Sequence, residues 1–230
     1  MRFQDAARDG RAVVYASLQL DPLVARIAEM LAGATFGERL LARAVMNGET
    51  IEPDGWRIAF PGLFAPDRAS DGRARSEAIL AASLAVAGRG EQVRSQLRGA
   101  IVEAVTARLV ARRVPAGQVR RERRILFDGV RAEVHPYDVT AEVTGRAEAY
   151  DCKWGARGIS SEVLLQLDAA RSNAADEDEQ LDVALVIFDA LRSCLVRLSR
   201  ETAPLDATGL ISLETLDRLA VRPAASARRP

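Results

Sequence analysis

The chain has 230 residues, of which 48% are hydrophobic, so it is long enough for one large domain or two small ones with a substantial core. Its 32 basic and 32 acidic residues cancel, which excludes a protein that holds nucleic acid through overall charge but leaves room for a local basic patch. Two cysteines and a single histidine, His135, exclude a disulfide framework and a zinc site made of several histidines.

Residues 1–90 are expected to be a mainly helical segment. Asp21-Pro22 is typical of a helix start, and apolar residues then recur at helical spacing as far as Gly33. A second helix is predicted from Phe36 to Val45. Farther along we predict a short strand over Trp56–Phe60, a loop over Pro61–Gly72 and a helix over Arg75–Val86.

Residues 91–222 are more regular and are expected to form an α/β domain with a mixed sheet flanked by helices. The pattern predicts these elements in order: a helix over Gln92–Val114, strands over Glu122–Phe127, within Val130–Val143 and over Arg146–Trp154, a helix over Gly158–Arg171, a buried strand over Leu181–Phe188, a helix over Leu191–Arg200, a strand over Leu210–Leu213 and a helix over Glu214–Ala220. Residues 223–230 are expected to be a flexible tail.

The chain has one lysine, Lys153, among 32 basic residues. Arginine keeps its proton permanently, whereas the pKa of a lysine ammonium shifts with its surroundings. A lysine retained in a chain that otherwise uses arginine is therefore a candidate for a position that arginine cannot fill.

Strand alternation places Asp151 and Lys153 on one face of their strand. The preceding strand carries Asp138, and a tight turn at Thr144-Gly145 predicts antiparallel pairing that brings Asp138 towards Asp151. Two converging carboxylates repel unless a cation separates them, and oxygen ligands favour Mg²⁺ or Mn²⁺. The lysine would then deprotonate an attacking water or neutralise charge in the transition state.

These residues resemble a known signature. His135-Pro136-Tyr137-Asp138, followed after twelve residues by Asp151-Cys152-Lys153, is similar to the motif of the PD-(D/E)XK nuclease superfamily, with the first aspartate one residue later after the proline. The order of predicted elements over residues 91–220 resembles the restriction-endonuclease-like core. Gly99-Ala100-Ile101-Val102-Glu103 is similar to the Gly-x-x-x-Glu helix of Mrr-like and resolvase-like members.

The resemblance implies a Mg²⁺-dependent (or Mn²⁺-dependent) endonuclease. Asp138 and Asp151 would bind the metal with Glu103 as a third ligand, Lys153 would assist the attacking water, and Gln166 matches an auxiliary polar residue of several families. DNA is favoured over RNA as the substrate, and restriction, repair or anti-phage defence are the processes that the family suggests. Residues 1–90 would serve recognition, dimerisation or contact with a protein partner.

A local basic patch is the second expectation from the residues. Six arginines lie close together before and within the first predicted strand of residues 91–222, and they are candidates for contacts to the phosphate backbone: Arg112, Arg113, Arg120, Arg121, Arg123 and Arg124. A solvated face is the competing interpretation. No segment approaches the ~18 apolar residues of a membrane span, so we expect a cytoplasmic protein with no membrane partner.

Two other hypotheses remain open from the sequence. The chain would be a catalytically inactive nuclease-like module for nucleic-acid binding or assembly, or an interaction protein whose motif is accidental. Metal-dependent cleavage that needs Lys153 separates the nuclease from both.

Overall fold

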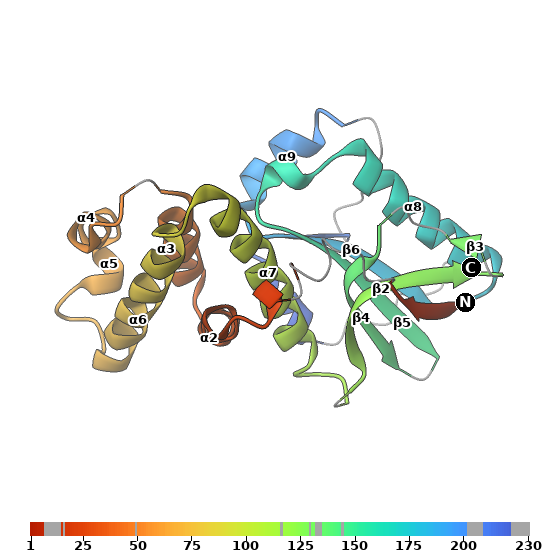
Figure 1. The fold of residues 1–230 in the computed structure, drawn as a ribbon, viewed down its shortest axis with the longest axis horizontal. Coiled ribbons are helices and arrows are strands. Elements are labelled where there is room, and N and C mark those ends of the chain that lie inside the picture. Colours follow the sequence, from red (N-terminus) through yellow and green to blue (C-terminus); the bar gives the residue numbers. More distant parts are fainter. Residues whose placement is uncertain are drawn as a thin grey trace. The chain divides into compact units, whose positions relative to one another are not determined.

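A computed structural model describes residues 1–6, 15, 17–48, 50–115, 117–128, 130–131, 135–143, 145–201 and 209–221 (Figure 1). By their internal contacts the residues divide into two units. A sheet unit contains Met1–Ala6 and Thr106–Pro230, and a helical unit contains Ala7–Val105. The predicted tail, residues 223–230, lies outside the described residues.

The helical unit contains α2 (Pro22–Ala32), α3 (Phe36–Asn47), α4 (Pro53–Ala59), α5 (Pro61–Phe64), α6 (Ser70–Ala87) and most of α7 (Glu91–Val110). Asp21 caps α2, since its side chain accepts a hydrogen bond from the Leu23 N–H, and Pro22 occupies the first turn. Thr35 and Glu38 form a capping box at the start of α3. The sequence predicted both helices.

The strand predicted over Trp56–Phe60 is wrong, because these residues form α4 and its C-cap. Trp56 and Phe60 pack on the cluster around Leu41 and Leu80, whereas Ile58 between them is 79% exposed. Trp56 and Phe60 are four residues apart, a spacing that places them on one face of a helix or of a strand. Pro53 favours the start of a helix. The predicted loop over Pro61–Gly72 is too long, because α5 occupies its first four residues and α6 begins at Ser70.

The sheet unit contains a mixed sheet, as predicted. Along the sheet the described strands follow the order β1 (Arg2–Asp5), β2 (Val119–Phe127), β4 (Tyr137–Val143), β5 (Arg146–Lys153), β6 (Leu181–Ile187) and β7 (Leu210–Ile211). β3 (Val130–Arg131) pairs with β2. Neighbours from β1 to β5 are antiparallel, whereas β5, β6 and β7 run parallel.

Helical segments connect the parallel strands. The turn of 3₁₀ helix η1 (Ala156–Gly158) and α8 (Ser161–Asp176) follow β5, and α9 (Leu191–Leu198) follows β6. Ser160 caps α8 by accepting a hydrogen bond from the Val163 N–H. The final predicted helix is a 3₁₀ segment, η2 (Leu216–Ala220), and the strand β1 within residues 1–90 was not predicted.

The two faces of the sheet contact different elements. Ala149 and Leu185 belong to a buried cluster with Leu164, Leu167 and Cys194 of α8 and α9. On the opposite face the thiol of Cys152 donates a hydrogen bond to the hydroxyl of Thr106, in the last turns of α7, at 3.5 Å. Residues of α8 and α9 thus cover one face of the sheet, and the end of α7 contacts the other.

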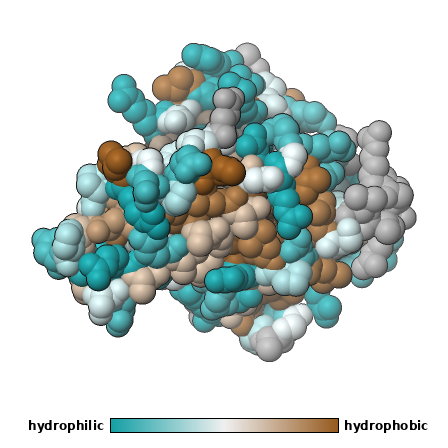
Figure 2. Space-filling model, turned by 60° about the vertical axis from the view of Figure 1, so that its left-hand side comes forward, coloured by the Kyte–Doolittle hydropathy of each residue, from teal (hydrophilic) through white to brown (hydrophobic). Residues whose placement is uncertain are grey.

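No helix among the described residues is long and apolar enough to cross a membrane. Some large hydrophobic side chains remain exposed, among them Leu20 and Val221. Figure 2 shows one face of the molecule, on which hydrophobic patches (brown) lie among hydrophilic surface (teal). Isolated exposed apolar residues are ordinary in globular proteins.

A buried carboxylate should make the helical unit sensitive to acid. Glu38 is fully buried and forms ion pairs of 3.0 Å with Arg68 and Arg75. Burial by itself raises the pKa of Glu38, but hydrogen bonds from the Thr35 N–H and from Arg75 outweigh it and lower the pKa below its ordinary value of 4.5. The folded-state pKa is therefore below the unfolded-state pKa, so this stabilisation is present above pH 4.5 and is lost as the pH falls through the lowered value.

We therefore expect the melting temperature, followed by circular dichroism, to fall as the pH decreases from about 5 to about 3. Glu38→Gln should melt at a lower temperature at neutral pH and change less over the same range. Asp67→Asn, at an exposed position, is the matched control. Equal pH dependence in Glu38→Gln and the wild type would contradict this expectation.

Candidate metal centre

The hairpin of β4 and β5 brings the signature residues together. Val139 pairs with Tyr150, so Asp138 and Asp151 occupy the next positions along the two strands. The Cys152 N–H donates a hydrogen bond to Asp138 Oδ2 at 2.6 Å, and Lys153 Nζ lies 2.5 Å from Asp151 Oδ1. The geometry agrees with the expected strand phase, in which Asp151 and Lys153 share a face.

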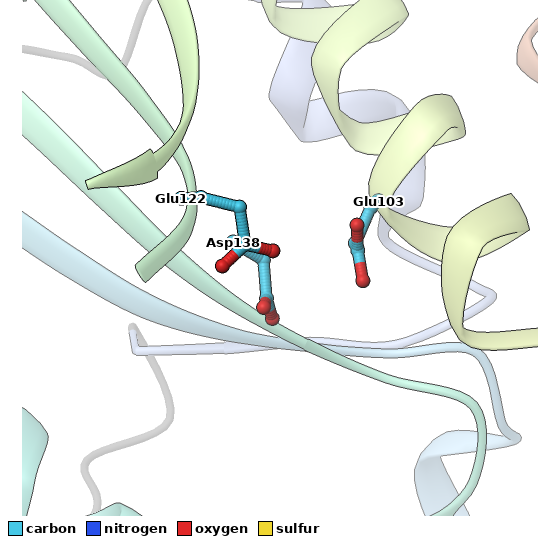
Figure 3. A group of neighbouring side chains, drawn as sticks. All are labelled: Glu103, Glu122 and Asp138. Carbon is cyan, nitrogen blue, oxygen red and sulfur yellow. The ribbon is translucent and has the colours of Figure 1, made fainter. Parts of the chain in front are cut away.

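A second carboxylate lies next to Asp138 in the sheet unit. One oxygen of Glu122 lies within 4.8 Å of one oxygen of Asp138. Figure 3 shows both side chains extending from their strands. Asp151, which the sequence placed beside Asp138 as a ligand, is paired with Lys153. Glu103, the expected third ligand, belongs to the helical unit.

Glu122 was not among the candidate ligands from the sequence. Arg121 pairs with Val139 and Arg123 with Tyr137, so Glu122 stands opposite Asp138 on the neighbouring strand. Like charges directly opposite each other destabilise a sheet. Glu122 also has a left-handed backbone (φ 54°) in the middle of β2, a conformation that is uncommon for residues other than glycine. The signal in the sequence was a single acid within a run of arginines, and only the strand register shows its partner.

Glu103 is buried, and the helical unit holds its side chain. The hydroxyl of Tyr15 and the amide of Gln19 each donate a hydrogen bond to its carboxylate, the latter at 2.6 Å. Gly99, one turn earlier, leaves the space for Tyr15, because a Cβ there would lie 2.9 Å from the Tyr15 hydroxyl. This gives the Gly-x-x-x-Glu pattern a physical meaning in this chain. α7 continues without a break to Thr106, which contacts the sheet through Cys152.

The electrostatics favour a charged lysine. Burial by itself would lower the pKa of the Lys153 ammonium, but the carboxylates of Asp151 and Asp138 outweigh it and raise the pKa above its ordinary value. Gly158 of η1 packs against the stem of Lys153, since a Cβ at residue 158 would lie 2.7 Å from Lys153 Cβ and Cγ. A protonated lysine can neutralise charge in the transition state but cannot take a proton from water. Of the two expected roles of Lys153, neutralisation of charge is therefore favoured.

Gln166 does not contact the carboxylates through the hydrogen bonds described. Its side chain accepts a hydrogen bond from the His135 N–H at 3.3 Å and donates one to the His135 carbonyl at 3.2 Å. His135 itself is exposed, next to Glu162. Gln166 therefore fixes the backbone three residues before Asp138, which is an indirect way to position that carboxylate.

The six arginines of the expected basic patch differ in their surroundings. Arg113 is buried in an ion pair with Glu148 and donates to the Leu219 carbonyl. Arg123 is bound to Glu142 and to the Phe3 carbonyl. These two guanidinium groups therefore stabilise the fold and are poorly available to a phosphate. Arg112 and Arg120 are exposed, and Arg121 and Arg124 are partly buried.

No protein-family model, curated protein or solved structure matches this chain.

Proposed function

We propose that this protein is a metal-dependent nuclease that hydrolyses phosphodiester bonds of DNA, and that the sheet unit, with its boundary at Thr106 in place of the expected residue 91, is a domain of the PD-(D/E)XK type. The observation that carries the proposal is that Glu122 and Asp138 stand opposite each other on β2 and β4, with the Asp151–Lys153 pair on the adjoining strand β5. Two carboxylates opposite each other on neighbouring strands repel, and a bound cation relieves that repulsion.

The donor set fits a hard divalent cation. Carboxylate oxygens are the ligands that Mg²⁺ and Mn²⁺ prefer, and Mg²⁺ in phosphoryl-transfer sites also keeps waters and takes phosphate oxygens. Such an ion supplies Lewis acidity to the phosphoryl oxygen and makes a bound water more acidic. Glu122 and Asp138 would hold it, with Glu103 as the third ligand that the resemblance implies, and Asp151 is a further carboxylate named by the signature.

The chain's own groups then have separate tasks. The Lys153 ammonium would neutralise the negative charge that builds on the phosphoryl oxygens in the transition state. Tyr15 and Gln19 would keep Glu103 in place, and Gln166 would orient the segment that leads to Asp138. The order α7, β2, β4, β5, α8, β6, with two antiparallel pairings followed by a parallel one, supports the resemblance to the restriction-endonuclease-like core.

Cleavage assays with Lys153→Arg test this proposal. Plasmid DNA, single-stranded DNA and RNA are incubated with the protein in Mg²⁺, in Mn²⁺ and in EDTA. We expect cleavage of DNA in the presence of the metal, none in EDTA, and a rate about 100-fold lower for Lys153→Arg, because the planar guanidinium cannot replace an ammonium packed against Gly158.

Arg218→Lys, at an exposed position of η2, is the reciprocal control and should cleave like the wild type. Cleavage that persists in EDTA, or full activity in Lys153→Arg, would contradict the mechanism. Binding of DNA without cleavage in either metal would favour the alternative, a nuclease-like module that binds nucleic acid.

A further inference from the structure

A shallow basic pocket lies in the sheet unit, apart from Glu122 and Asp138. It has a volume of about 350 Å³, within the roughly 300–1,000 Å³ of pockets that take small ligands. Four arginines of η1, α9 and the residues after α9 line it, together with Ala156, Ser193 and Val196: Arg157, Arg192, Arg197 and Arg200. None of these lining residues is acidic.

The walls of the pocket are fixed by a buried aspartate. Asp189 follows β6 and is 5% exposed. One of its oxygens accepts a hydrogen bond from the Ala156 N–H at 3.0 Å, and the other accepts from the Ala190 N–H at 2.8 Å. The same carboxylate therefore ties η1 to the start of α9, and the pocket is a built feature of the fold.

The charge of this pocket is only partly balanced. Arg197 donates to the Ile159 carbonyl and forms an ion pair with Glu201 at 2.9 Å. Among the residues that the structure describes, no acidic side chain forms an ion pair with Arg157, Arg192 or Arg200, and all three are exposed. Arginine is the general cation of this chain, so what distinguishes these residues is their convergence on one concave surface.

A phosphodiester matches this arrangement. A guanidinium group binds two phosphate oxygens at once through parallel hydrogen bonds. Several arginines around one hollow repel one another, and a bound anion reduces that repulsion. Ala156 and Val196 give the pocket an apolar wall, against which the sugar of a nucleotide can pack. Recognition of this kind reads the backbone and carries no sequence information.

We infer that this pocket, which we call the η1–α9 pocket, binds the backbone of the DNA strand on which the proposed nuclease acts. The inference rests on the proposed function and deepens it. η1 begins three residues after Lys153, and its Gly158 packs on the lysine stem, so a backbone phosphate in the pocket would be placed by the element that also supports Lys153. The principal phosphate contact would then lie in the η1–α9 pocket, and not at the arginines at positions 112–124.

Binding in EDTA tests the inference separately from cleavage. The probe is a short fluorescein-labelled DNA, single-stranded or duplex, and anisotropy gives its affinity over a series of salt concentrations. We expect the double variant Arg192→Ala, Arg200→Ala to bind about tenfold more weakly or worse, with a salt dependence (log K against log [salt]) shallower by about 2, because two phosphate contacts are lost.

The matched control is the pair Arg89→Ala, Arg218→Ala, which removes two exposed arginines outside the pocket. Equal affinity and equal salt dependence in the two double variants would overturn the inference. A pocket that binds only small anions would also overturn the inference. In that case inorganic phosphate would raise the melting temperature of the wild type but not of the pocket variant, and both would bind DNA equally well.

Failure of the proposed function looks different. If the wild type binds DNA through the pocket but does not cleave it with Mg²⁺ or Mn²⁺, the nuclease proposal fails and the binding site stands. If the wild type cleaves and the pocket variant binds and cleaves like the control pair, the nuclease proposal stands and the pocket is a solvated basic surface.

Discussion

Asp138→Asn should abolish cleavage and at the same time stabilise the protein when no metal is present. We expect the rate to fall about 1,000-fold, because an amide is a weak ligand for a hard cation and carries no charge to hold it. The side chain keeps its shape, and its oxygen still accepts the hydrogen bond from the Cys152 N–H. The loss of activity would therefore not reflect the loss of that hydrogen bond.

The gain in stability follows from the charges. Glu122 and Asp138 stand opposite each other, so removal of one negative charge relieves repulsion of about 1 kcal/mol. The melting temperature in EDTA should rise by about 2–4 °C. Mg²⁺ or Mn²⁺ should raise the melting temperature of the wild type, because an ion that binds the folded state stabilises it, and should raise that of Asp138→Asn far less.

Asp128→Asn is the matched control, since Asp128 lies exposed in the turn after β2. It should leave cleavage and metal-induced stabilisation unchanged. Equal thermal stabilisation of Asp138→Asn and the wild type by Mg²⁺ would show that Asp138 does not hold the ion, whatever the activity.

Breaking the buried pair of Arg113 and Glu148 should have the largest effect on stability. The side chains of Arg113 and Glu148 are 8% and 2% exposed. They form two hydrogen bonds with each other, and the Arg113 guanidinium also donates to the Tyr150 hydroxyl at 2.9 Å. Glu148→Ala leaves a buried guanidinium without its carboxylate, so we expect a loss of about 3–5 kcal/mol in the free energy of unfolding and a fall of about 10 °C in melting temperature.

The control is an exposed pair on the same sheet. Asp182, on β6, pairs with Arg146 and its side chain is 50% exposed, so Asp182→Ala should cost less than about 1 kcal/mol. The double variant Arg113→Met, Glu148→Leu should recover part of the loss, because apolar side chains leave no buried charge. Urea unfolding measures all three. A cost of Glu148→Ala as small as that of Asp182→Ala would contradict the role given to this pair.

Arg113 illustrates where residue patterns reach their limit. In the sequence it is one of six arginines in a basic stretch, indistinguishable from Arg112 beside it. In the structure Arg112 is exposed, whereas Arg113 reaches Glu148 and the Leu219 carbonyl, residues far away in the chain. A long flexible side chain makes such contacts only through tertiary packing, and no local pattern reports them.

The elements around the candidate site follow the local pattern closely. The strands β5 and β6 lie within one residue of their predicted bounds, because side-chain alternation acts within a few residues. The helices α7 and α8 were predicted as well, but α7 ends at Val110 and not at Val114, and α8 runs from Ser161 to Asp176 and not from Gly158 to Arg171. α4 was missed because Trp56 and Phe60 fit either a helix or a strand, and packing against α3 and α6 decides between the two.

By itself the sequence determined the mixed α/β class, the hairpin that carries Asp138 and Asp151, and the position of Lys153 beside Asp151, since each depends on strand alternation and one turn. Only the tertiary structure decided which carboxylate stands opposite Asp138. Glu122 does so through the register of β2 on β4, whereas Asp151 is held by Lys153. The tertiary structure also brings the arginines of η1 and α9 to one pocket, because strand register and helix placement depend on the whole core.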